Sequence, residues 1–426
     1  MKENKNAEIS EIVNPIVEKK QKITNNIINE LIGIKESFEL PEKLMSILKE
    51  KNKKTNLLNQ FLNYDVDLSN DILRDYFQEE HSDRKGLKQD YTPDCLCKLI
   101  SMLQIKSNNL LDICSGTGAL TIHSCKENMT FQCEEYSNMS IPILLLNLSL
   151  RNFSGIVLEK NVLTNETIKL YKLVKKEKFS DIEFIDNLKE NKFDAIISNP
   201  PYSMEWNPKY DDRFKGYELA PKNKADYSFI LDGLYRLNKN GQALFILPHG
   251  ILFRGGSEGK IRKQLIENNF IDAVIGLPSN LFLNTSIQTL ILVLKKDRDN
   301  NNILFINSSE QYKKIGKQNV MLEEHINKIV DTFKERKQID KFSSVVEKNK
   351  IIKNDYNLNI PRYVDTSEDE PTIDLKEVVK GIIEIDDEIK KTNVELKKLI
   401  VQLRGTNPQD KKYYEESIKP FIEWLG

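Results

Sequence analysis

The chain has 426 residues, which is enough for two or three domains with a sizeable core, and 30% of the residues are charged. Its 63 Lys and Arg residues against 64 Asp and Glu residues give a formal net charge of −1, unlike the strongly basic balance of a protein that binds nucleic acid on its own. The first residues carry no apolar signal region and the longest apolar run, IPILLLNLSL, is too short to cross a bilayer, so we expect a cytoplasmic protein without membrane contact. Five cysteines without a C-x-x-C pair, and only four histidines, favour a reducing compartment and predict no metal site.

Residues 1 to about 85 predict a helical N-terminal domain. The segments NIINELIGIKESF and EKLMSILKEKNKKTNLLNQFL carry apolar residues at spacings of three and four, with few β-branched alternations. From about residue 107, helical stretches alternate with seven short apolar runs: NLLDIC, TFQCEE, GIVLE, FDAIIS, QALFIL, DAVIGL and QTLILVL. This alternation predicts βαβ units and a mostly parallel sheet, and therefore an α/β fold. The lysine-rich KLYKLVKKEKF (169–179) is interpreted as a solvated helix face.

The C-terminal part begins with a predicted linker, the acidic and proline-bearing SEDEPT (367–372). The apolar residues that follow alternate steps of three and four, with one threonine among them: Leu375, Val378, Ile382, Ile385, Ile389, Thr392, Leu396, Leu399 and Leu403. This is a heptad seam of about four repeats, which predicts a helix that docks on another helix. That second helix can belong to a partner chain or to the helical N-terminal domain, and the sequence leaves both open.

The first chemical motif is LLDICSGTGAL, in which Asp112 ends a strand and Gly116, Thr117 and Gly118 form the turn into a helix. Glycines let the backbone turn tightly and come close to a ligand, as in nucleotide-binding βα turns. The third glycine of the dinucleotide fingerprint is Thr121 here. Taken alone, the motif is therefore equally typical of an ordinary turn from a strand into a helix.

An acidic pair follows at the end of the next predicted strand, where Glu135 stands 17 residues after Gly118 and directly after Glu134. A carboxylate in this place can accept hydrogen bonds from ribose hydroxyls. Because side chains alternate along a strand, Glu135 shares a face with Phe131 and Cys133, which favours Glu135 over Glu134 for this role. Either glutamate could instead be a solvated strand end.

The second motif is AIISNPPYSMEW (195–206), which sets two prolines directly behind an apolar run. Proline donates no backbone hydrogen bond and fixes its own φ, so Pro200 and Pro201 must end the strand. Asn199 is thereby left at the carboxyl end of the strand, where open α/β sheets bind ligands, and Tyr202 follows three residues later. We therefore expect a binding or catalytic site here.

A glycine turn, an acidic strand end and Asn-Pro-Pro-Tyr, in this order, resemble the amino-methyltransferases that use S-adenosylmethionine. The lone pair of an exocyclic amino nitrogen is delocalised into its ring, so the site must hold this poor nucleophile in line with the methyl group. By this resemblance, the side-chain oxygen of Asn199 and the carbonyl of Pro200 accept the two N–H bonds. Tyr202 stacks on a base rotated out of the duplex, and Pro201 helps to stiffen the turn.

Longer stretches narrow the resemblance to the modification (M) subunit of type I restriction-modification systems. They are DYTP (90–93), residues 224–282, NTSIQTLILVLKK (284–296) and NDYNLNIPRYV (354–364), and the likeness covers roughly residues 86 to 403. It implies that Tyr91, Thr92 and Pro93 lie near the methionine end of the cofactor, and that Asp112, Gly116, Thr117 and Gly118 form the cofactor loop. Two positions depart from the family pattern: Lys88 replaces a common glycine, and Asn161 replaces an acidic residue. Asn161 could still bond the adenine ring of the cofactor as donor and acceptor.

The resemblance also implies an architecture and an activity. A Rossmann-like S-adenosylmethionine-dependent methyltransferase core (86–300) is expected between a helical N-terminal domain (1–85) and a core extension with linker (301–371), followed by a coiled-coil-like helical segment for partner docking (372–426). The implied activity is methylation of adenine N6 in double-stranded DNA. The implied partners are a specificity (S) subunit, usually with two M subunits for each S subunit, and a restriction (R) subunit.

The residues also bear on other methylation reactions. Methylation of cytosine C5 needs a cysteine nucleophile, usually behind a proline, and none of the five cysteines follows a proline. Methylation of cytosine N4 or of a protein glutamine uses the same Asn-Pro-Pro-Tyr geometry and stays an alternative, although the length and the C-terminal segments disfavour glutamine. A non-catalytic scaffold subunit is the third alternative.

Overall fold

The computed structural model describes residues 20–80, 91–283, 286–367, 374–403 and 406–425. Lys88, Asp90 of the DYTP motif, and most of the predicted linker, including Thr372, lie outside these residues. The chain divides into two compact units, Met1–Thr366 and Ser367–Gly426.

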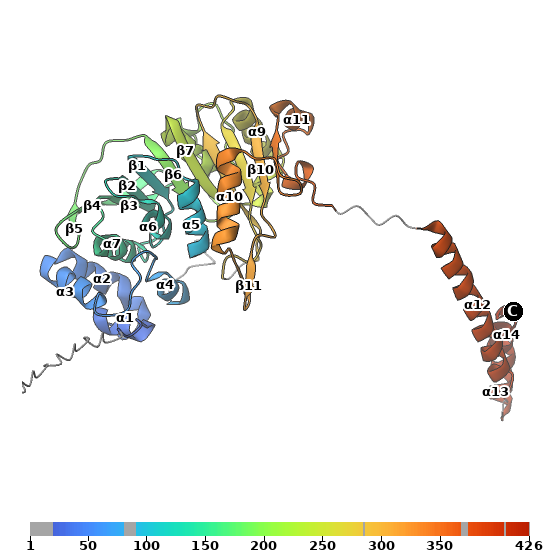
Figure 1. The fold of residues 1–426 in the computed structure, drawn as a ribbon. Helices are drawn as coiled ribbons and strands as arrows, with labels where there is room; N and C mark the ends of the chain where they lie inside the picture. Colours follow the sequence, from blue (N-terminus) through green and yellow to red (C-terminus); the bar gives the residue numbers. More distant parts are fainter. Residues whose placement is uncertain (1–19, 81–90, 284–285, 368–373, 404–405, 426) are drawn as a thin grey trace, which may run out of the picture. The chain divides into compact units, whose positions relative to one another are not determined.

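The first unit is built on one sheet of eleven strands in the order β13-β10-β8-β9-β7-β6-β1-β2-β3-β4-β5 (Figure 1). The strands are β1 (Asn109–Ile113), β2 (Thr130–Glu135), β3 (Gly155–Asn161), β4 (Glu166–Val174), β5 (Asp181–Phe184), β6 (Phe193–Ser198), β7 (Leu237–Pro248), β8 (Ile271–Gly276), β9 (Thr289–Lys295), β10 (Ile303–Asn307) and β13 (Ser343–Val346). A separate two-stranded hairpin is formed by β11 (Lys313–Ile315) and β12 (Gln318–Val320). All seven predicted apolar runs are confirmed as strands.

The prediction of a mostly parallel sheet is right for the five strands from β7 to β3 in the sheet order and wrong for most of the others. Strands β3, β2, β1, β6 and β7 are parallel neighbours, and β8 pairs with β10 in parallel. By contrast, β4, β5, β9 and β13 pair antiparallel with their neighbours. Only residues 162–165 separate β3 from β4, and a connection this short cannot make the crossover that parallel strands need.

The interpretation of residues 169–179 as a helix face is wrong, because most of this segment is β4. Tyr171 and Leu173 are buried, and the exposed Lys172 lies between them. Buried and exposed side chains therefore alternate with the period of two of a strand. The lysines of this segment form a charge run in the sequence, and this run conceals the alternation of buried and exposed positions.

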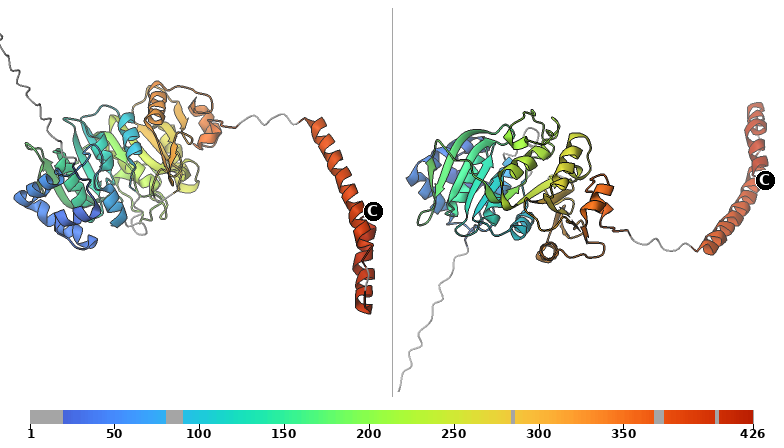
Figure 2. Two further views of the ribbon diagram at one scale, coloured as in Figure 1. Left: turned by 60° about the horizontal axis from the view of Figure 1, so that its bottom comes forward. Right: turned by 90° about the horizontal axis from the view of Figure 1, so that it is seen from above.

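Helices cover both faces of the sheet (right-hand view of Figure 2). The helices of the first unit are α1 (Asn25–Ile32), α2 (Leu40–Lys49), α3 (Lys51–Phe61), α4 (Arg74–Glu80), α5 (Asp94–Leu103), α6 (Ala119–Ser124), α7 (Ile141–Leu150), α8 (Asp226–Arg236), α9 (Gly256–Glu267), α10 (Glu323–Glu335) and α11 (Lys348–Lys353). Side chains of β1 point to the two faces of the sheet and therefore belong to two layers of the core. Leu110 packs with α5, α6, α7 and α10. Leu111 and Ile113 pack with α8 and α9 on the other face. The N-terminal helices α1 to α4 join the first of these two layers.

The apolar run IPILLLNLSL forms α7, and all ten of its residues are buried. This helix lies against α2, and its residues belong to the core layer that also contains side chains of β1 and β6. Burial on every side explains why its sequence shows no polar face. Within the described residues, no helix is both long and apolar enough to span a bilayer.

The second unit confirms the predicted C-terminal helix. Helix α12 spans Leu375–Ile400, and the Asp374 side chain caps its start by accepting from the Lys376 N–H at 2.9 Å. None of its residues is buried, and Leu403 lies in the turn after its end. The two further α-helices are α13 (Pro408–Tyr413) and α14 (Lys419–Trp424).

Candidate active site

The carboxyl ends of β1, β2, β3 and β6 border a cavity of about 210 Å³. Strand β1 lies between β2 and β6. The chain first adds strands on the β2 side of β1 and then continues on the β6 side. The carboxyl end of β1 is therefore the switch point at which open α/β sheets bind ligands. Eleven of the fourteen predicted site residues line this cavity: Tyr91, Thr92, Gly116, Thr117, Glu134, Glu135, Asn161, Asn199, Pro200, Pro201 and Tyr202. Pro93, Asp112 and Gly118 do not line it.

The two glycines of the first motif are required by backbone geometry. Gly116 and Gly118 have φ of +57° and +94°, in the left-handed region that side chains disfavour. A Cβ on Gly116 would lie 3.0 Å from the Tyr91 ring, and one on Gly118 would lie 2.8 Å from Leu144 of α7. Gly116 therefore keeps the cavity wall close to Tyr91, whereas Gly118 lets α6 begin against α7.

Asp112 lies beneath this turn and is fully buried. Its Oδ2 accepts a hydrogen bond from Thr121 Oγ1 at 2.6 Å, and its Oδ1 has no hydrogen-bond partner among the described residues. Burial raises the pKa of Asp112 to about 7, although the hydrogen bonds from Thr121 act in the opposite direction. Asp112 thus ties β1 to α6, which explains why Thr121 stands where a third glycine was expected.

Glu135 connects the end of β2 with the glycine turn. Its Oε2 accepts from the Gly116 N–H and its Oε1 from the Ser137 N–H, both at 2.8 Å. Burial raises the pKa of this carboxyl, and the two backbone donors partly offset the effect. A carboxylate offers about four lone-pair sites, so both oxygens keep acceptor capacity toward the cavity.

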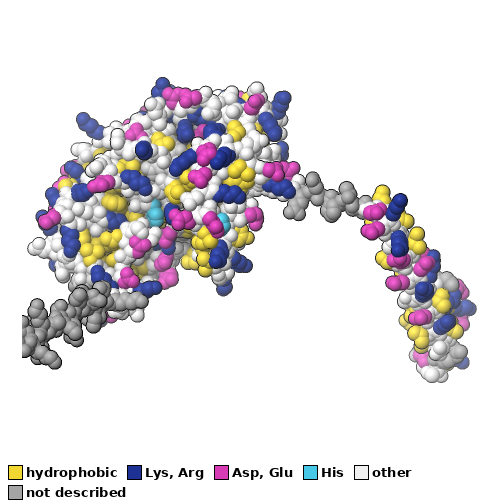
Figure 3. All heavy atoms as spheres, viewed as in Figure 1, with side chains coloured by type: hydrophobic (Ala, Val, Ile, Leu, Met, Phe, Trp, Pro, Cys, Tyr) yellow, Lys and Arg dark blue, Asp and Glu magenta, His cyan; other side chains and the backbone are white. Residues whose placement is uncertain are grey.

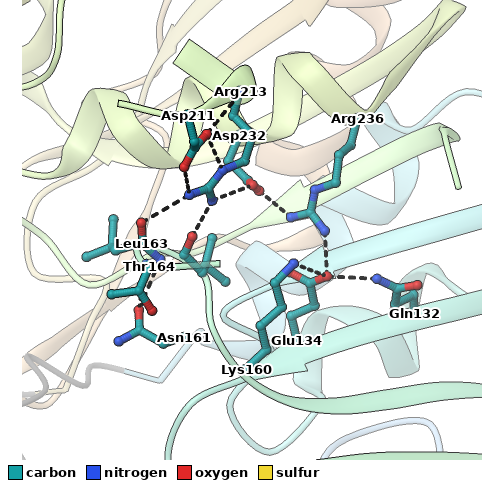
Figure 4. A network of polar contacts seen from close by, with 11 residues as sticks. Gln132, Glu134, Lys160, Asn161, Leu163, Thr164, Asp211, Arg213, Asp232 and Arg236 are labelled. Atoms are coloured by element: carbon teal, nitrogen blue, oxygen red, sulfur yellow. Dashed lines mark hydrogen bonds and ion pairs between the residues drawn. The ribbon is translucent and has the colours of Figure 1, made fainter. Parts of the chain in front are cut away.

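Glu134 lies in a different environment, a buried network of charges (Figure 4). Its Oε1 accepts from Gln132 at 2.7 Å and pairs with Lys160 at 3.2 Å and with Arg236 of α8. Burial alone would raise the pKa of Glu134, but the Arg236 and Lys160 cations hold it well below its usual range. Although Glu134 also borders the cavity, its charge is already compensated by protein groups.

The network continues from Arg236 to the wall of the cavity (Figure 4). Arg236 pairs with Asp232 four residues earlier in α8, and Asp232 pairs with Arg213 at 3.1 Å. Arg213 also donates to the backbone carbonyls of Val162 and Leu163. The segment after the Asn-Pro-Pro-Tyr turn is thereby fixed to the loop after β3. The sequence reasoning missed these residues, although an Asp and an Arg four apart on a helix are a usable signal.

This network predicts a large effect on stability. Arg236→Leu should lower the free energy of unfolding by about 3 to 5 kcal/mol, because it leaves the buried carboxylates of Glu134 and Asp232 without their shared cation. Urea denaturation measures this change. Lys239→Gln is the matched control, since the Lys239 side chain is 83% exposed and its ion pair with Asp297 should contribute little to the free energy of unfolding. Equal midpoints for the two variants would contradict the prediction.

Asn161 ends β3 at the edge of the same cavity. Its Oδ1 accepts from the Leu163 and Thr164 N–H groups, at 3.1 and 3.3 Å. The side chain thus forms the tight turn that leads into β4, which Asn favours. An aspartate would accept the same two hydrogen bonds, so this turn does not account for the departure from the acidic residue, and the predicted contact with adenine stays a prediction.

The Asn-Pro-Pro-Tyr turn follows β6 as expected. Asn199 Nδ2 donates to Thr92 Oγ1 at 3.0 Å, and Asn199 Oδ1 accepts from the Tyr202 hydroxyl at 2.7 Å. The two sequence motifs are therefore in direct contact. Ser203, with φ of +49°, donates its N–H at 2.8 Å to Asp226, the first residue of α8.

Four residues around this turn were not among the predicted site residues. Phe282, in the loop after β8, meets the Tyr202 ring edge-on with ring centroids 6.1 Å apart. Trp206 lines the cavity and donates its indole N–H to the Pro221 carbonyl at 3.2 Å. Asp226 also forms an ion pair with Arg254 at 2.7 Å, so the carboxylate that accepts the Ser203 N–H is itself paired with a cation. Trp206 follows Tyr202 by four residues, whereas only the tertiary fold brings Phe282, Asp226 and Arg254 to the turn.

Among the described residues, no group of three or more His, Cys, Asp or Glu side chains is placed to hold a metal ion. The five cysteines are free thiols. The expectation of a site without metal stays a prediction.

A glycine turn, an acidic strand end and a rigid Asn-Pro-Pro-Tyr turn around one cavity define the α/β core of a methyltransferase. The family described as N-6 DNA Methylase matches residues 67–371, and the chain belongs to this family. The resemblance noted from the motifs is thereby confirmed.

Known proteins that resemble the chain agree with this family. The methylase subunit of the type I restriction enzyme MpnII from Mycoplasma pneumoniae is 33% identical over 333 residues, which cover 74% of this chain and 60% of that protein. The MjaVIII methylase subunit from Methanocaldococcus jannaschii is 31% identical, with 70% and 53% covered. The chain therefore spans between half and two thirds of the length of these relatives. The crystal structure of a type I restriction-modification methyltransferase subunit from Streptococcus thermophilus superimposes with a TM-score of 0.61 at 30% identity, over 80% of each chain.

Proposed function

We propose that the chain is an S-adenosylmethionine-dependent methyltransferase of adenine N6 in double-stranded DNA, and that it acts as the modification subunit of a type I restriction-modification complex. The observation that carries this proposal is the shared cavity of Asn199 and Glu135. Asn199, after the end of β6, offers an acceptor for an amino group, and Glu135, at the end of β2 on the other side of β1, offers a carboxylate suited to ribose hydroxyls. Family membership and the relatives named as methylase subunits support the same reading.

The residues present fit S-adenosylmethionine. Gly116 leaves room where a Cβ would press on the Tyr91 ring, and Glu135 keeps acceptor capacity beside it. In the proposed arrangement, Glu135 holds the ribose, Asn161 bonds the adenine ring, and Tyr91, Thr92 and Pro93 lie toward the methionine end. When bound, the cofactor supplies an electrophilic methyl group.

The catalytic turn would hold the nucleophile. Asn199 Oδ1 and the Pro200 carbonyl each accept one N–H of the target amino group, which orients the nitrogen and raises its electron density. Two prolines in a row make the turn stiff and remove backbone donors that would compete for these acceptors. The Tyr202 ring would stack on the flipped base, and the edge of Phe282 fixes the orientation of that ring. The Tyr202 hydroxyl bonds Asn199 Oδ1, and this amide oxygen keeps a second lone pair for the amino group.

The assignment of the ribose-binding carboxylate makes a prediction about the two glutamates. Glu135→Ala should weaken S-adenosylmethionine binding by about 1 to 3 kcal/mol, because ribose hydroxyls lose their acceptor in a partly desolvated cavity. Isothermal titration calorimetry measures this loss. Glu134→Ala should instead lower the melting temperature, since Arg236 and Lys160 lose their buried counter-charge. A larger loss of cofactor affinity in Glu134→Ala than in Glu135→Ala would reverse the assignment.

The proposed complex uses the exposed face of α12. Ten of its apolar residues are between 37% and 73% exposed, among them Leu375, Ile382 and Leu399. Surfaces of this kind mark interaction sites. We infer that α12 packs against a helix of a specificity subunit, with two modification subunits for each specificity subunit, and that a restriction subunit completes the nuclease. Docking of α12 on the helical N-terminal domain is the alternative.

The function is tested by transfer of a labelled methyl group from S-adenosylmethionine, with the chain co-expressed with its specificity subunit. Digestion of the DNA to nucleosides should give N6-methyladenine at a defined sequence. Recovery of N4-methylcytosine, or of methylated protein glutamine, would support one of the alternatives instead. A scaffold without catalysis should give no heat on titration with S-adenosylmethionine.

A further inference from the structure

The hairpin β11–β12 lies at the same edge of the sheet as the catalytic turn. Strand β10, which leads into the hairpin, is parallel to β8, and both run in the same direction as β7 and β6. The carboxyl ends of these strands therefore open on one edge. In Figure 1 the hairpin projects beyond the neighbouring helix α10.

Hydrogen bonds fix strand β12 of the hairpin to the loop that carries Phe282. The Asn319 N–H donates to the Asn280 carbonyl at 3.0 Å, and the Asn319 side chain donates to the Ser279 carbonyl at 2.8 Å. The Gln318 side chain donates to the Leu281 carbonyl at 2.6 Å. The next residue of that loop is Phe282, which contacts the Tyr202 ring. The hairpin and the catalytic turn are thus joined through one short loop.

Strand β11 and the turn of the hairpin are exposed and basic. Residues 311–320 (QYKKIGKQNV) contain three lysines and no acidic residue, in a chain whose net charge is −1. Lys313, Lys314 and Lys317 are exposed, and none of them forms an ion pair with another described residue. Ile315 at the turn is 54% exposed. The projecting end of the hairpin carries dark blue side chains in Figure 3. A fixed strand β12 beside an exposed and uncompensated basic strand β11 favours a polyanion as the ligand.

We propose that the hairpin β11–β12 binds the phosphate backbone of duplex DNA beside the target base, through Lys313, Lys314 and Lys317. This inference rests on the proposed function, because it takes duplex DNA as the substrate of the cavity. A two-stranded ribbon fits the major groove, which is about 12 Å wide, and contacts to phosphate set the position of a protein on the duplex without reading its sequence. The loop from Ser279 to Phe282 then holds the bound backbone in a fixed relation to Tyr202.

The test measures binding of fluorescein-labelled duplex DNA to the full chain by anisotropy over a series of salt concentrations. Replacing Lys313, Lys314 and Lys317 together by Gln should weaken binding at low salt by roughly 10- to 100-fold and reduce the slope of log K against log salt by about 1 to 3. Replacement of the same three lysines by Arg keeps the charge and should keep the affinity. Unchanged melting temperature and S-adenosylmethionine affinity show that the variants are folded.

A second triple variant is the matched control. Lys172, Lys175 and Lys176 belong to β4 and the residues after it, which end at the opposite edge because β4 is antiparallel to β3. Their change to Gln removes the same charge and should leave binding within a factor of about two of wild type. Equal losses in both triple variants would overturn the hairpin inference and leave the proposed function standing. Failure of the wild type to bind duplex DNA at low salt, both alone and together with its specificity subunit, would overturn both. Loss of binding to a specificity subunit, with duplex affinity unchanged, would assign the hairpin to a protein interface and also overturn the inference.

Discussion

Asn199→Ala is expected to lower the rate of methyl transfer to DNA by at least about 100-fold, while the affinity for S-adenosylmethionine stays close to that of wild type. The substitution removes one of the two acceptors that would hold the amino nitrogen. The Gly116 turn and Glu135, which would hold the cofactor, should keep their geometry, since the Asn199 amide bonds Thr92 and Tyr202. Single-turnover transfer of a labelled methyl group, with calorimetry on the same preparation, measures both quantities.

Tyr202→Phe is the control for this variant. It removes the hydroxyl that bonds Asn199 Oδ1 but keeps the ring that would stack on the base. Activity within about tenfold of wild type is expected, because stacking depends on the ring face and not on the hydroxyl. Activity like that of wild type in Asn199→Ala would refute the catalytic assignment. A loss in Tyr202→Phe as large as that in Asn199→Ala would show that the hydroxyl, and not the amide acceptor, limits the reaction.

Removal of residues 372–426 is expected to abolish assembly with the specificity subunit and to leave S-adenosylmethionine binding intact. The truncation deletes α12 with its exposed apolar residues, whereas the cavity lies wholly within Met1–Thr366. A long apolar seam on a single helix is stabilised by packing against another helix. Co-purification with a tagged specificity subunit measures assembly, and calorimetry measures cofactor binding.

A double variant distinguishes the contribution of the apolar seam of α12 from that of the rest of the deleted segment. Ile382→Asp with Ile389→Asp places two charges on the seam without shortening the helix, and it should also prevent co-purification. Lys380→Asp with Lys391→Asp changes exposed charged positions of the same helix and should assemble. Assembly of the truncated chain would contradict the docking proposal. Loss of cofactor binding on truncation would favour the alternative in which α12 docks on the helical N-terminal domain.

The sequence by itself determined the central strands, the glycine turn, the end of β6 at the double proline and the long helix α12. These features depend on local chemistry: apolar runs bounded by turn residues, φ angles that only glycine adopts freely, and a heptad period. Family membership also followed from the order of short motifs along the chain. The lysine-rich segment shows the converse, because its charges concealed the period of two that makes it β4.

The tertiary structure decided which groups meet. Nothing near Glu134 in the sequence shows that Arg236 lies beside it, and this ion pair is what distinguishes its environment from that of Glu135. Likewise, Asn199 bonds Thr92, and strand β12 of the hairpin bonds the loop of Phe282, only because the fold brings segments that are distant in the sequence to one edge of the sheet. Long-range contacts of this kind depend on strand order and register. Local sequence patterns specify where a strand begins and ends, but they do not specify which strand becomes its neighbour.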